Sequence, residues 1–494
     1  MQREITALED NDTWTLELLP PGKRAIDSKW VYKIKYRPDG TMERYKARLV
    51  AKDFTQLEGI DFHDTFAPVA KLVNVRVLLA VAAHKSWPLH QLDVNNAFLH
   101  GDFDEEVYMK LPPRFSHAGD QRVCRLRKSL YGLRQASRNW YAKFTSALQE
   151  FGFVVSKADP SLFLYERPGT FVVVLIYVDD VVLTGDIPDV ISRVKTFLRD
   201  RFSIKDLGPL KYFHGIEVAR SPEGIVLCQR KYTSHILADS GLGAARPSGF
   251  PMEQNHSLTQ PHDEQADEVS AYRRLIGRLL YLTITRPHIA YSVNILSQFV
   301  HSPSPAHVEA AHRVLRYLKA APGQGLFLPA ASTLELTAYC DADWAGCWST
   351  RRSMTGYYIK LATAPVSWRA KKQRVVSRSY AEAEYRAMAS TTSEVLWLRF
   401  LLGELRVPQR SPTVLYCDNQ AALHISANPV FHERTKHVEM DCYFVRERVA
   451  SSDIQPRKVH TSSQLADIFT KALGTKQFHF LLSKLGICNL HASA

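Results

Sequence analysis

The most apolar stretch of the chain is interrupted by two acids. Residues 171–178 (FVVVLIYV) are apolar, Asp179 and Asp180 follow, and residues 181–183 (VVL) are apolar again. β-Branched and aromatic residues on both sides predict two antiparallel strands joined at Asp179-Asp180. Such a hairpin would hold two carboxylates at the tip of a buried sheet. Aspartate is also a common turn residue, so this stretch alone leaves a purely structural turn open.

Three further apolar segments are predicted to be strands that end in a carboxylate. They are residues 89–94 with Asp93, residues 334–341 with Asp341 and residues 414–418 with Asp418. A side chain at the end of a strand is exposed yet held by the sheet, which suits a functional site. Two predicted helices carry further acids: residues 379–405 carry Glu382 and Glu384, and residues 463–472 carry Asp467.

The remaining pattern outlines the rest of the architecture. Alternation over residues 30–36 and 44–50, with Pro38-Asp39-Gly40 between them, predicts a basic hairpin with interleaved aromatic residues. Such a face suits phosphate contact, and a solvated sheet face fits equally well. Helical spacing predicts helices over residues 72–84, 140–151, 190–201 and 272–319, and residues 244–268 read as an exposed linker.

Length and charge bring in a domain count and a class of partner. The 494 residues indicate two to four domains, and 63 Lys and Arg against 50 Asp and Glu give a formal net charge of +13. A polyanionic partner such as nucleic acid would explain the excess, although a basic surface alone is common.

Cysteine usage and apolar runs indicate the compartment. Seven scattered cysteines without a Cys-x-x-Cys pair indicate reduced thiols in an intracellular protein. The longest apolar run has eight residues, which is too short to span a bilayer, and the N-terminal residues lack the apolar segment of a signal peptide.

The acids fall into two candidate clusters. One contains Asp93, Asp179 and Asp180, and the other contains Asp341, Glu384, Asp418 and Asp467. Both offer hard oxygen ligands, which favour Mg²⁺ or Mn²⁺ over zinc. Two such ions can activate a hydroxyl and stabilise a leaving oxygen in phosphoryl transfer. His432, His437 and Cys442 have a spacing that fits no standard zinc module.

Eight motifs, in order along the chain, carry a resemblance to a known family. They are residues 44–52 (RYKARLVAK), 91–101 (QLDVNNAFLHG), 130–136 (LYGLRQA), 177–180 (YVDD), 339–346 (YCDADWAG), 381–387 (AEAEYRA), 415–422 (LYCDNQAA) and 464–471 (QLADIFTK). The chain resembles the polymerase portion of a copia-type LTR retrotransposon Pol polyprotein, in which reverse transcriptase is followed by ribonuclease H. Nothing in it resembles the protease or the zinc unit of integrase, so we expect a partial polyprotein or a mature fragment.

The resemblance implies an α+β multidomain fold. A right-hand polymerase with fingers and palm would occupy residues 1–250, a linker and helical connection residues 251–335, an α/β ribonuclease H-like domain residues 336–475, and a C-terminal tail residues 476–494. The implied activity is RNA- and DNA-directed DNA synthesis with cleavage of RNA in RNA–DNA hybrids, using two Mg²⁺ or Mn²⁺ ions per active site.

Residue roles carry over motif by motif. Asp93 and Asp179 match the acids that hold both polymerase metals, with Asp180 in support. Lys46 and Arg48 match residues of the fingers that contact the incoming triphosphate. Phe98 matches the steric gate, a bulky residue that excludes a ribose 2′-hydroxyl. Gln135 matches a glutamine that lies near the sugar of the nucleotide. Residues 213–217 (FHGIE) resemble the primer-grip hairpin. The nuclease carboxylates and metal ligands would be Asp341, Glu384, Asp418 and Asp467, whereas Glu382, two residues from Glu384 on a helix, would point elsewhere.

The resemblance also implies the partners and the location. The partners would be an RNA template, a DNA primer, an RNA–DNA hybrid and deoxynucleoside triphosphates, with no membrane partner; the oligomeric state is open. The location would be intracellular, in a cytoplasmic virus-like particle. Whether the protein is also present in the nucleus is open.

Three residues depart from the family pattern. Family members usually carry Gly at the position of Asp53, an aliphatic residue at that of His214, and Ser or Thr at that of Tyr380. A Gly position often needs positive φ, so Asp53 is expected to strain the fingers, and Tyr380 to crowd Glu384. These departures keep two alternatives open: a catalytically inactive relic that only binds nucleic acid, and a nuclease without polymerase activity.

Overall fold

The computed structural model describes residues 1–36, 41–103, 105–115, 120–256, 258, 266, 268–427 and 439–489. The predicted turn at Pro38-Asp39-Gly40 and the pair His432 and His437 lie outside these residues. The chain forms two compact units. The N-terminal unit contains residues 1–70 and 88–210, and the C-terminal unit contains residues 71–87 and 211–494.

A six-stranded sheet is the centre of the N-terminal unit. Its strands, in spatial order, are β12 (Ile204–Pro209), β5 (Leu89–Val94), β11 (Asp180–Gly185), β10 (Thr170–Tyr177), β9 (Leu162–Arg167) and β8 (Val154–Val155). All neighbouring strands are antiparallel. The predicted apolar hairpin is therefore confirmed as β10 and β11, with β5 pairing along the far edge of β11.

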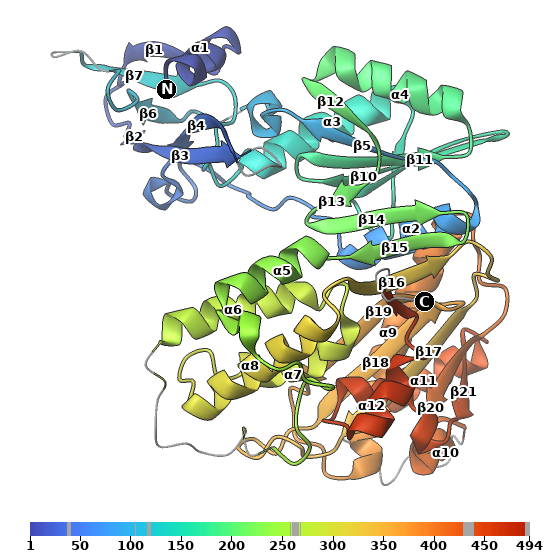
Figure 1. Ribbon diagram of the computed structural model, residues 1–494. Coiled ribbons are helices and arrows are strands. Elements are labelled where there is room, and N and C mark those ends of the chain that lie inside the picture. Colours follow the sequence, from blue (N-terminus) through green and yellow to red (C-terminus); the bar gives the residue numbers. More distant parts are fainter. Residues whose placement is uncertain are drawn as a thin grey trace. The chain divides into compact units, whose positions relative to one another are not determined.

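Two helices cover one face of this sheet, α3 (Ala136–Phe151) and α4 (Pro188–Arg201) (Figure 1). The predicted stripe on α3 is buried at Trp140, Phe144 and Leu148, and it packs on the alternate residues Val172, Val174 and Ile176 of β10. Gly152, with φ of 109°, ends α3 in the left-handed conformation that glycine adopts at low cost. The packing fixes the hairpin against the helices.

Smaller elements complete the N-terminal unit. A four-stranded sheet has the order β1 (Trp14–Leu18), β7 (Arg122–Leu126), β6 (Tyr108–Lys110) and β2 (Ala25–Ile26), and β3 (Ser28–Tyr36) pairs with β4 (Met42–Ala51). The helix α1 (Gln2–Asp10) packs beside β4. The predicted basic hairpin is thus confirmed. Asp53 begins a 3-10 turn, Asp53–Thr55, with an ordinary helical backbone, so the strain expected there is absent.

The C-terminal unit begins with a helix from early in the chain. The helix α2 (Leu72–His84) is buried at every position from Asn74 to Ala83, and it packs against a sheet whose strands come from much later. This sheet has the order β13 (Tyr212–Phe213), β14 (Ile216–Ser221), β15 (Gly224–Cys228), β16 (Gln324–Pro329) and β22 (Ile487–Asn489).

Four helices between β15 and β16 pack on one another (Figure 1). They are α5 (Arg230–Asp239), α6 (Val269–Leu282), α7 (Ala290–Ser297) and α8 (Pro305–Ala320). The helical connection predicted for residues 251–335 is present as α6 to α8. Pro305 begins α8, and Ser304 and His307 form a capping box at its start. The side chain of each of these two residues accepts a hydrogen bond from the backbone N–H of the other.

The second sheet of this unit combines both strand directions. Its order is β19 (Ala364–Lys372), β18 (Met354–Leu361), β17 (Leu336–Asp343), β20 (Thr413–Cys417) and β21 (Ile454–Lys458). The strands β17 to β19 are antiparallel, whereas β20 and β21 run parallel to β17. The helices of this region are α9 (Tyr380–Glu404), α10 (Gln420–Ala427), α11 (Glu439–Ala450) and α12 (Thr475–Leu482). Parallel strands place the C-terminal ends of β17 and β20 side by side.

The compact units do not follow the predicted domain limits. Residues 71–87 and 211–250, which we assigned to the polymerase, lie in the compact C-terminal unit, where the apolar α2 and β15 are buried. Residues 476–494, named a tail, contain most of α12 and all of β22. None of the described helices is long and apolar enough to cross a bilayer.

Candidate polymerase and nuclease centres

Strand pairing brings the three polymerase acids together. Asp93 on β5 lies directly opposite Asp180 on β11, and the Val94 backbone N–H donates to the Asp179 carbonyl at 2.9 Å. Asp180 Oδ1 accepts a hydrogen bond from Gln91 Nε2 at 3.2 Å. The predicted meeting of Asp93 with the hairpin tip across one sheet is therefore confirmed, although some 86 residues separate them along the chain.

This cluster is open to solvent. Asp179 is exposed, and Asp93 and Asp180 are half-buried. Burial, and then the charge of Asp179, raises the pKa of Asp93, while Lys205 on β12 lowers it. Metal ligands need to lie close together. Among the described residues, the carboxylate oxygens of these three acids do not all lie within 4.8 Å of one another. The three acids are thus neighbours, but their side chains are not arranged to bind one cation together.

The tip of the hairpin is one residue earlier than predicted. Tyr177 pairs with Asp180, so Val178 and Asp179 form the turn and Asp180 is the first residue of β11. Val178 has φ of 59°, a conformation that a β-branched residue adopts only at a cost. Trp140 of α3 donates from Nε1 to the Val178 carbonyl at 2.7 Å. The buried helix therefore holds the turn that presents Asp179.

The predicted nucleotide-binding residues Lys46 and Arg48 lie on β4. Arg48 stacks over the Tyr131 ring at 4.3 Å, and Tyr131 meets Phe98 edge to face, with ring centroids 5.3 Å apart. Burial, and then the charge of Arg48, lowers the pKa of Lys46. Both cations also lower the pKa of Asp93, so they act on the acid cluster electrostatically. The structure therefore places Arg48, Tyr131 and Phe98 in one continuous set of contacts.

Gln135 makes its polar contacts within the protein. Its side chain is fully buried, its oxygen accepts from Gln56 Nε2 at 3.0 Å, and its nitrogen donates to the Asp61 carbonyl at 2.8 Å. Both ends of the amide are therefore engaged by the 56–61 segment. This geometry fixes a loop, and the predicted contact with a nucleotide stays a prediction.

The four acids predicted for the nuclease converge in the C-terminal unit. Asp341 is at the end of β17, Asp418 follows β20, Glu384 is on α9, and Asp467 is in the 3-10 helix Leu465–Phe469. Oxygens of Asp341, Asp418 and Asp467 lie within 4.8 Å of one another, and Glu384 forms a second such group with Cys417 and Asp418. The four acids thus lie in two overlapping groups that share Asp418, and their role as metal ligands stays a prediction.

Three of the four acids in this cluster are buried. Asp341 and Glu384 have no exposed surface, and Asp467 is 3% exposed. Burial raises the pKa of Asp341 and that of Glu384, and burial with the charge of Asp341 raises the pKa of Asp467 to about 8. Asp341 Oδ1 and Asp418 Oδ1 are buried without a hydrogen-bond donor among the described residues. Buried carboxylates with unpaired oxygens fit a divalent cation.

Two neighbouring residues were missed in the sequence. Lys471 Nζ lies 3.0 Å from Asp467 Oδ1 and 3.6 Å from Asp341 Oδ2, and the Thr470 hydroxyl donates to Asp341 Oδ2. Burial opposes the charge of Lys471, but Asp341 and Asp467 raise its pKa. Its spacing of four residues from Asp467 was the available signal.

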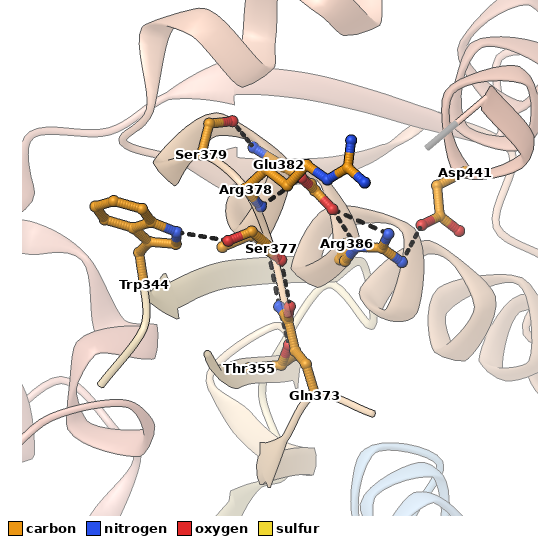
Figure 2. A network of polar contacts seen from close by, with 10 residues as sticks. Trp344, Thr355, Gln373, Ser377, Arg378, Ser379, Glu382, Arg386 and Asp441 are labelled. Atoms are coloured by element: carbon orange, nitrogen blue, oxygen red, sulfur yellow. Dashed lines mark hydrogen bonds and ion pairs between the residues drawn. The ribbon is translucent and has the colours of Figure 1, made fainter. Parts of the chain in front are cut away.

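Glu382 and Glu384 on α9 contact different groups, and their predicted roles stay predictions. Glu382 accepts from the Arg378 backbone N–H at 2.7 Å and pairs with Arg386 at 3.0 Å, and Arg386 lies 3.6 Å from Asp441 (Figure 2). The N-terminal turn of α9 is also capped by Ser379, which accepts from the Glu382 backbone at 3.2 Å. Glu382 therefore holds the start of the helix that presents Glu384.

Two of the departures lie at functional elements. Tyr380, one turn before Glu384, is 44% exposed, and burial followed by the charge of Glu384 raises its pKa. The predicted primer-grip hairpin is present as β13 and β14, with His214 and Gly215 as its turn. His214 has φ of 44°, and its carbonyl accepts from the Tyr281 hydroxyl. Tyr380 thus adjoins the nuclease cluster, and His214 adopts a strained turn.

Comparisons with known proteins agree with this geometry. Residues 11–254 match a family described as reverse transcriptase (RNA-dependent DNA polymerase). The chain is 44% identical over its whole length to the Pol polyprotein of transposon RE1 from Arabidopsis thaliana, of which it spans 34%. It is 32% identical over 308 residues to a Saccharomyces cerevisiae protein named for transposon Ty5-1, covering 62% of this chain and all of that protein.

The structure of a foamy viral protease-reverse transcriptase, in complex with an RNA/DNA hybrid, shares the fold. It has a TM-score of 0.51 and 11% identity, with coverage of 93% of this chain and 53% of that one. The family match assigns residues 11–254 to a reverse transcriptase (RNA-dependent DNA polymerase) domain. The chain belongs to the Pol polyproteins of copia-type retrotransposons, as its motifs indicated, and it spans about a third of the length of the RE1 polyprotein.

Proposed function

We propose that this chain synthesises DNA on RNA and DNA templates and cleaves the RNA strand of RNA–DNA hybrids during retrotransposon replication. The observation that carries the proposal is the pairing of Asp93 with Asp180 beside Asp179, within the part of the chain that matches reverse transcriptases. The second, buried cluster around Asp341 supports the nuclease activity. The RNA/DNA hybrid bound by the foamy viral relative supports the class of partner.

The cations would be Mg²⁺ or Mn²⁺, two at each centre. Asp93 and Asp179 would hold them in the polymerase, with Asp180 in support, and Asp341, Glu384, Asp418 and Asp467 would hold them in the nuclease. When bound, such ions activate the attacking oxygen and stabilise the leaving oxygen. The chain itself supplies the rigid strands that carry the acids.

Lys46, Arg48 and Phe98 would select the deoxynucleoside triphosphate. Lys46 and Arg48 place two positive charges near Asp93, which suits the triphosphate of an incoming nucleotide. Phe98 is held against Tyr131 and would exclude a ribose 2′-hydroxyl by its bulk. Gln135 would act near the sugar by holding the 56–61 segment. The protein would work inside a cytoplasmic virus-like particle, and its presence in the nucleus as well is open.

The direct test is primer extension on an RNA template, run beside cleavage of a labelled RNA–DNA hybrid, both with Mg²⁺. We expect Asp179→Asn to lose extension and keep cleavage, and Asp341→Asn to do the reverse. Extension that persists unchanged in Asp179→Asn would refute the polymerase assignment. A wild-type chain that binds hybrid but neither extends nor cleaves would identify an inactive relic, and one that only cleaves would identify a nuclease.

A further inference from the structure

The nuclease cluster contains a sulfur atom that the sequence interpretation, based on oxygen ligands alone, leaves out. Cys417 is the last residue of β20 and directly precedes Asp418. Its Sγ and one carboxylate oxygen each from Glu384 and Asp418 all lie within 4.8 Å of one another. Cys417 and Glu384 have no exposed surface, and Asp418 is half-buried. A thiol and two carboxylates therefore face one small volume.

The protein holds the ligand atoms of this group in place but does not satisfy all of their hydrogen-bonding capacity. The Asn419 backbone N–H donates to Cys417 Sγ at 3.4 Å, and Asn419 Oδ1 in turn accepts from the Ala422 N–H at 2.8 Å. Glu384 is fully buried, and among the described residues neither of its oxygens has a hydrogen-bond partner of ordinary geometry, although the Tyr380 hydroxyl is near enough to oppose the rise in its pKa.

The donor set differs from that of the neighbouring group. Asp341, Asp418 and Asp467 offer oxygen alone, which suits hard cations. Thiolate with carboxylate instead suits zinc or cadmium, whose tetrahedral sites have ligand atoms about 3.5 Å apart at ordinary bond lengths. The ligand atoms of Glu384, Cys417 and Asp418 lie within 4.8 Å of one another, so they can approach a common cation.

We propose that Glu384, Cys417 and Asp418 form a site for a thiophilic divalent cation of the Zn²⁺ class. Asp418 belongs to both groups, so this cation and the hard cation of the nuclease compete for one carboxylate. Zinc would therefore inhibit hybrid cleavage at Mg²⁺ concentrations that support it. The inhibition rests on the proposed nuclease activity, whereas the binding does not.

Cadmium binding tests the site without any activity. The probe is Cd²⁺ added to the metal-free full-length chain, followed by the ultraviolet charge-transfer absorption of a cadmium–thiolate bond and by calorimetry. We expect one tight equivalent with a thiolate band in the wild type, and loss of both in Cys417→Ser. Glu384→Gln should keep the band and weaken binding by tenfold or more. Cadmium binding without a thiolate band, or equal binding by Cys417→Ser, would overturn the proposal.

Two other cysteines give matched controls. Cys340 on β17 is fully buried, donates to the Tyr416 carbonyl at 3.6 Å and lies beside Cys417; Cys488 on β22 is half-buried. Cys340→Ser and Cys488→Ala should both keep the tight equivalent. Loss of the band in Cys340→Ser with retention in Cys417→Ser would refute the assignment of Cys417.

Competition with the reaction is measured separately. Hybrid cleavage at fixed Mg²⁺ is titrated with Zn²⁺, and each variant is normalised to its own uninhibited rate. We expect the Zn²⁺ concentration for half-inhibition to rise at least tenfold in Cys417→Ser and to stay near wild type in Cys488→Ala. An equal half-inhibition point in Cys417→Ser would overturn the competition. Absence of any cleavage with intact cadmium binding would instead count against the proposed function alone.

Discussion

The polymerase acids lie at the solvent-exposed tip of a hairpin, whereas the nuclease acids lie inside the C-terminal unit. Asp179 is exposed, and its neighbours do not form a compact ligand set; Asp341 and Glu384 are fully buried, and the four acids fall into two overlapping groups. Both centres begin from the same sequence device, an acid at the end of an apolar strand. The surroundings of the strand ends make the difference.

The comparison shows two ways of holding negative charges together. At the polymerase tip, water solvates the carboxylates, so their proximity costs little and the set can be completed when substrate and cations bind. At the nuclease, burial makes the same proximity expensive, and it is offset in part by Lys471 and by proton uptake. If this cluster is the proposed nuclease centre, the burial of its carboxylates makes a bound cation stabilising for the fold itself.

The largest expected effect comes from Glu384→Gln. Hybrid cleavage should fall on the order of 10³-fold because a ligand oxygen is lost at the cluster. Primer extension should be unchanged. Glu382→Gln is the matched control on the same helix, and it should cost less than tenfold in cleavage because it loses only the Arg386 pair and an N-terminal contact of α9. Equal losses in the two variants would mean that α9 acts through stability alone.

Stability should depend on pH in the C-terminal unit. The pKa of Asp467 is raised to about 8, and those of Asp341 and Glu384 are raised as well, so the folded state binds more protons than the unfolded one above pH ~4. The free energy of unfolding should therefore fall as the pH rises from ~4 towards the raised pKa values, which for Asp467 means to about 8. The fall should be up to about 1.4 kcal/mol per pH unit for each group.

Denaturant unfolding between pH 5 and pH 8, with a chelator or with Mg²⁺, measures this dependence. We expect Mg²⁺ to reduce the slope because it compensates the carboxylates, and Asp467→Asn to flatten it without Mg²⁺. A slope that is unaffected by both would contradict the stabilisation of the fold by a bound cation.

An intermediate effect is expected at Trp140, on the polymerase side. Trp140→Phe removes the donor to the Val178 carbonyl and leaves space in the core, which should cost about 1–3 kcal/mol of stability. Extension should fall about tenfold as Asp179 becomes less fixed. Tyr141→Phe, which loses one surface hydrogen bond to the Pro160 carbonyl, is the control and should keep its extension rate.

The smallest effect is expected at Val178 itself. Val178→Gly should raise the free energy of unfolding by about 1 kcal/mol because glycine adopts the positive φ without strain. Extension should decrease by no more than a few-fold. Val178→Ala keeps the unfavourable φ, so it should not gain stability, and a gain equal to that of glycine would show that φ is not the cause.

Much of the candidate site could be predicted from the sequence because the acids interrupt strongly apolar runs. The motifs placed Asp93 with Asp179 and Asp180, and Glu384 rather than Glu382 in the second cluster. The roles of Gln135 and Lys471 could not be obtained this way, since each depends on contacts with segments distant in the sequence or on the turn that Asp467 adopts. Asp53, predicted to be strained, adopts an ordinary 3-10 backbone because the local turn accepts any residue.

The sequence by itself determined the family and the strands that end in acids, and it singled out seven candidate carboxylates, because these depend on local pattern and motif. Only the tertiary structure decided that α2 and β13 to β15 pack in the C-terminal unit, and that the nuclease acids are buried around Lys471 and Cys417. Burial arises from the packing of distant segments, and it is burial that separates an exposed acid tip from a buried cluster of the same residue types.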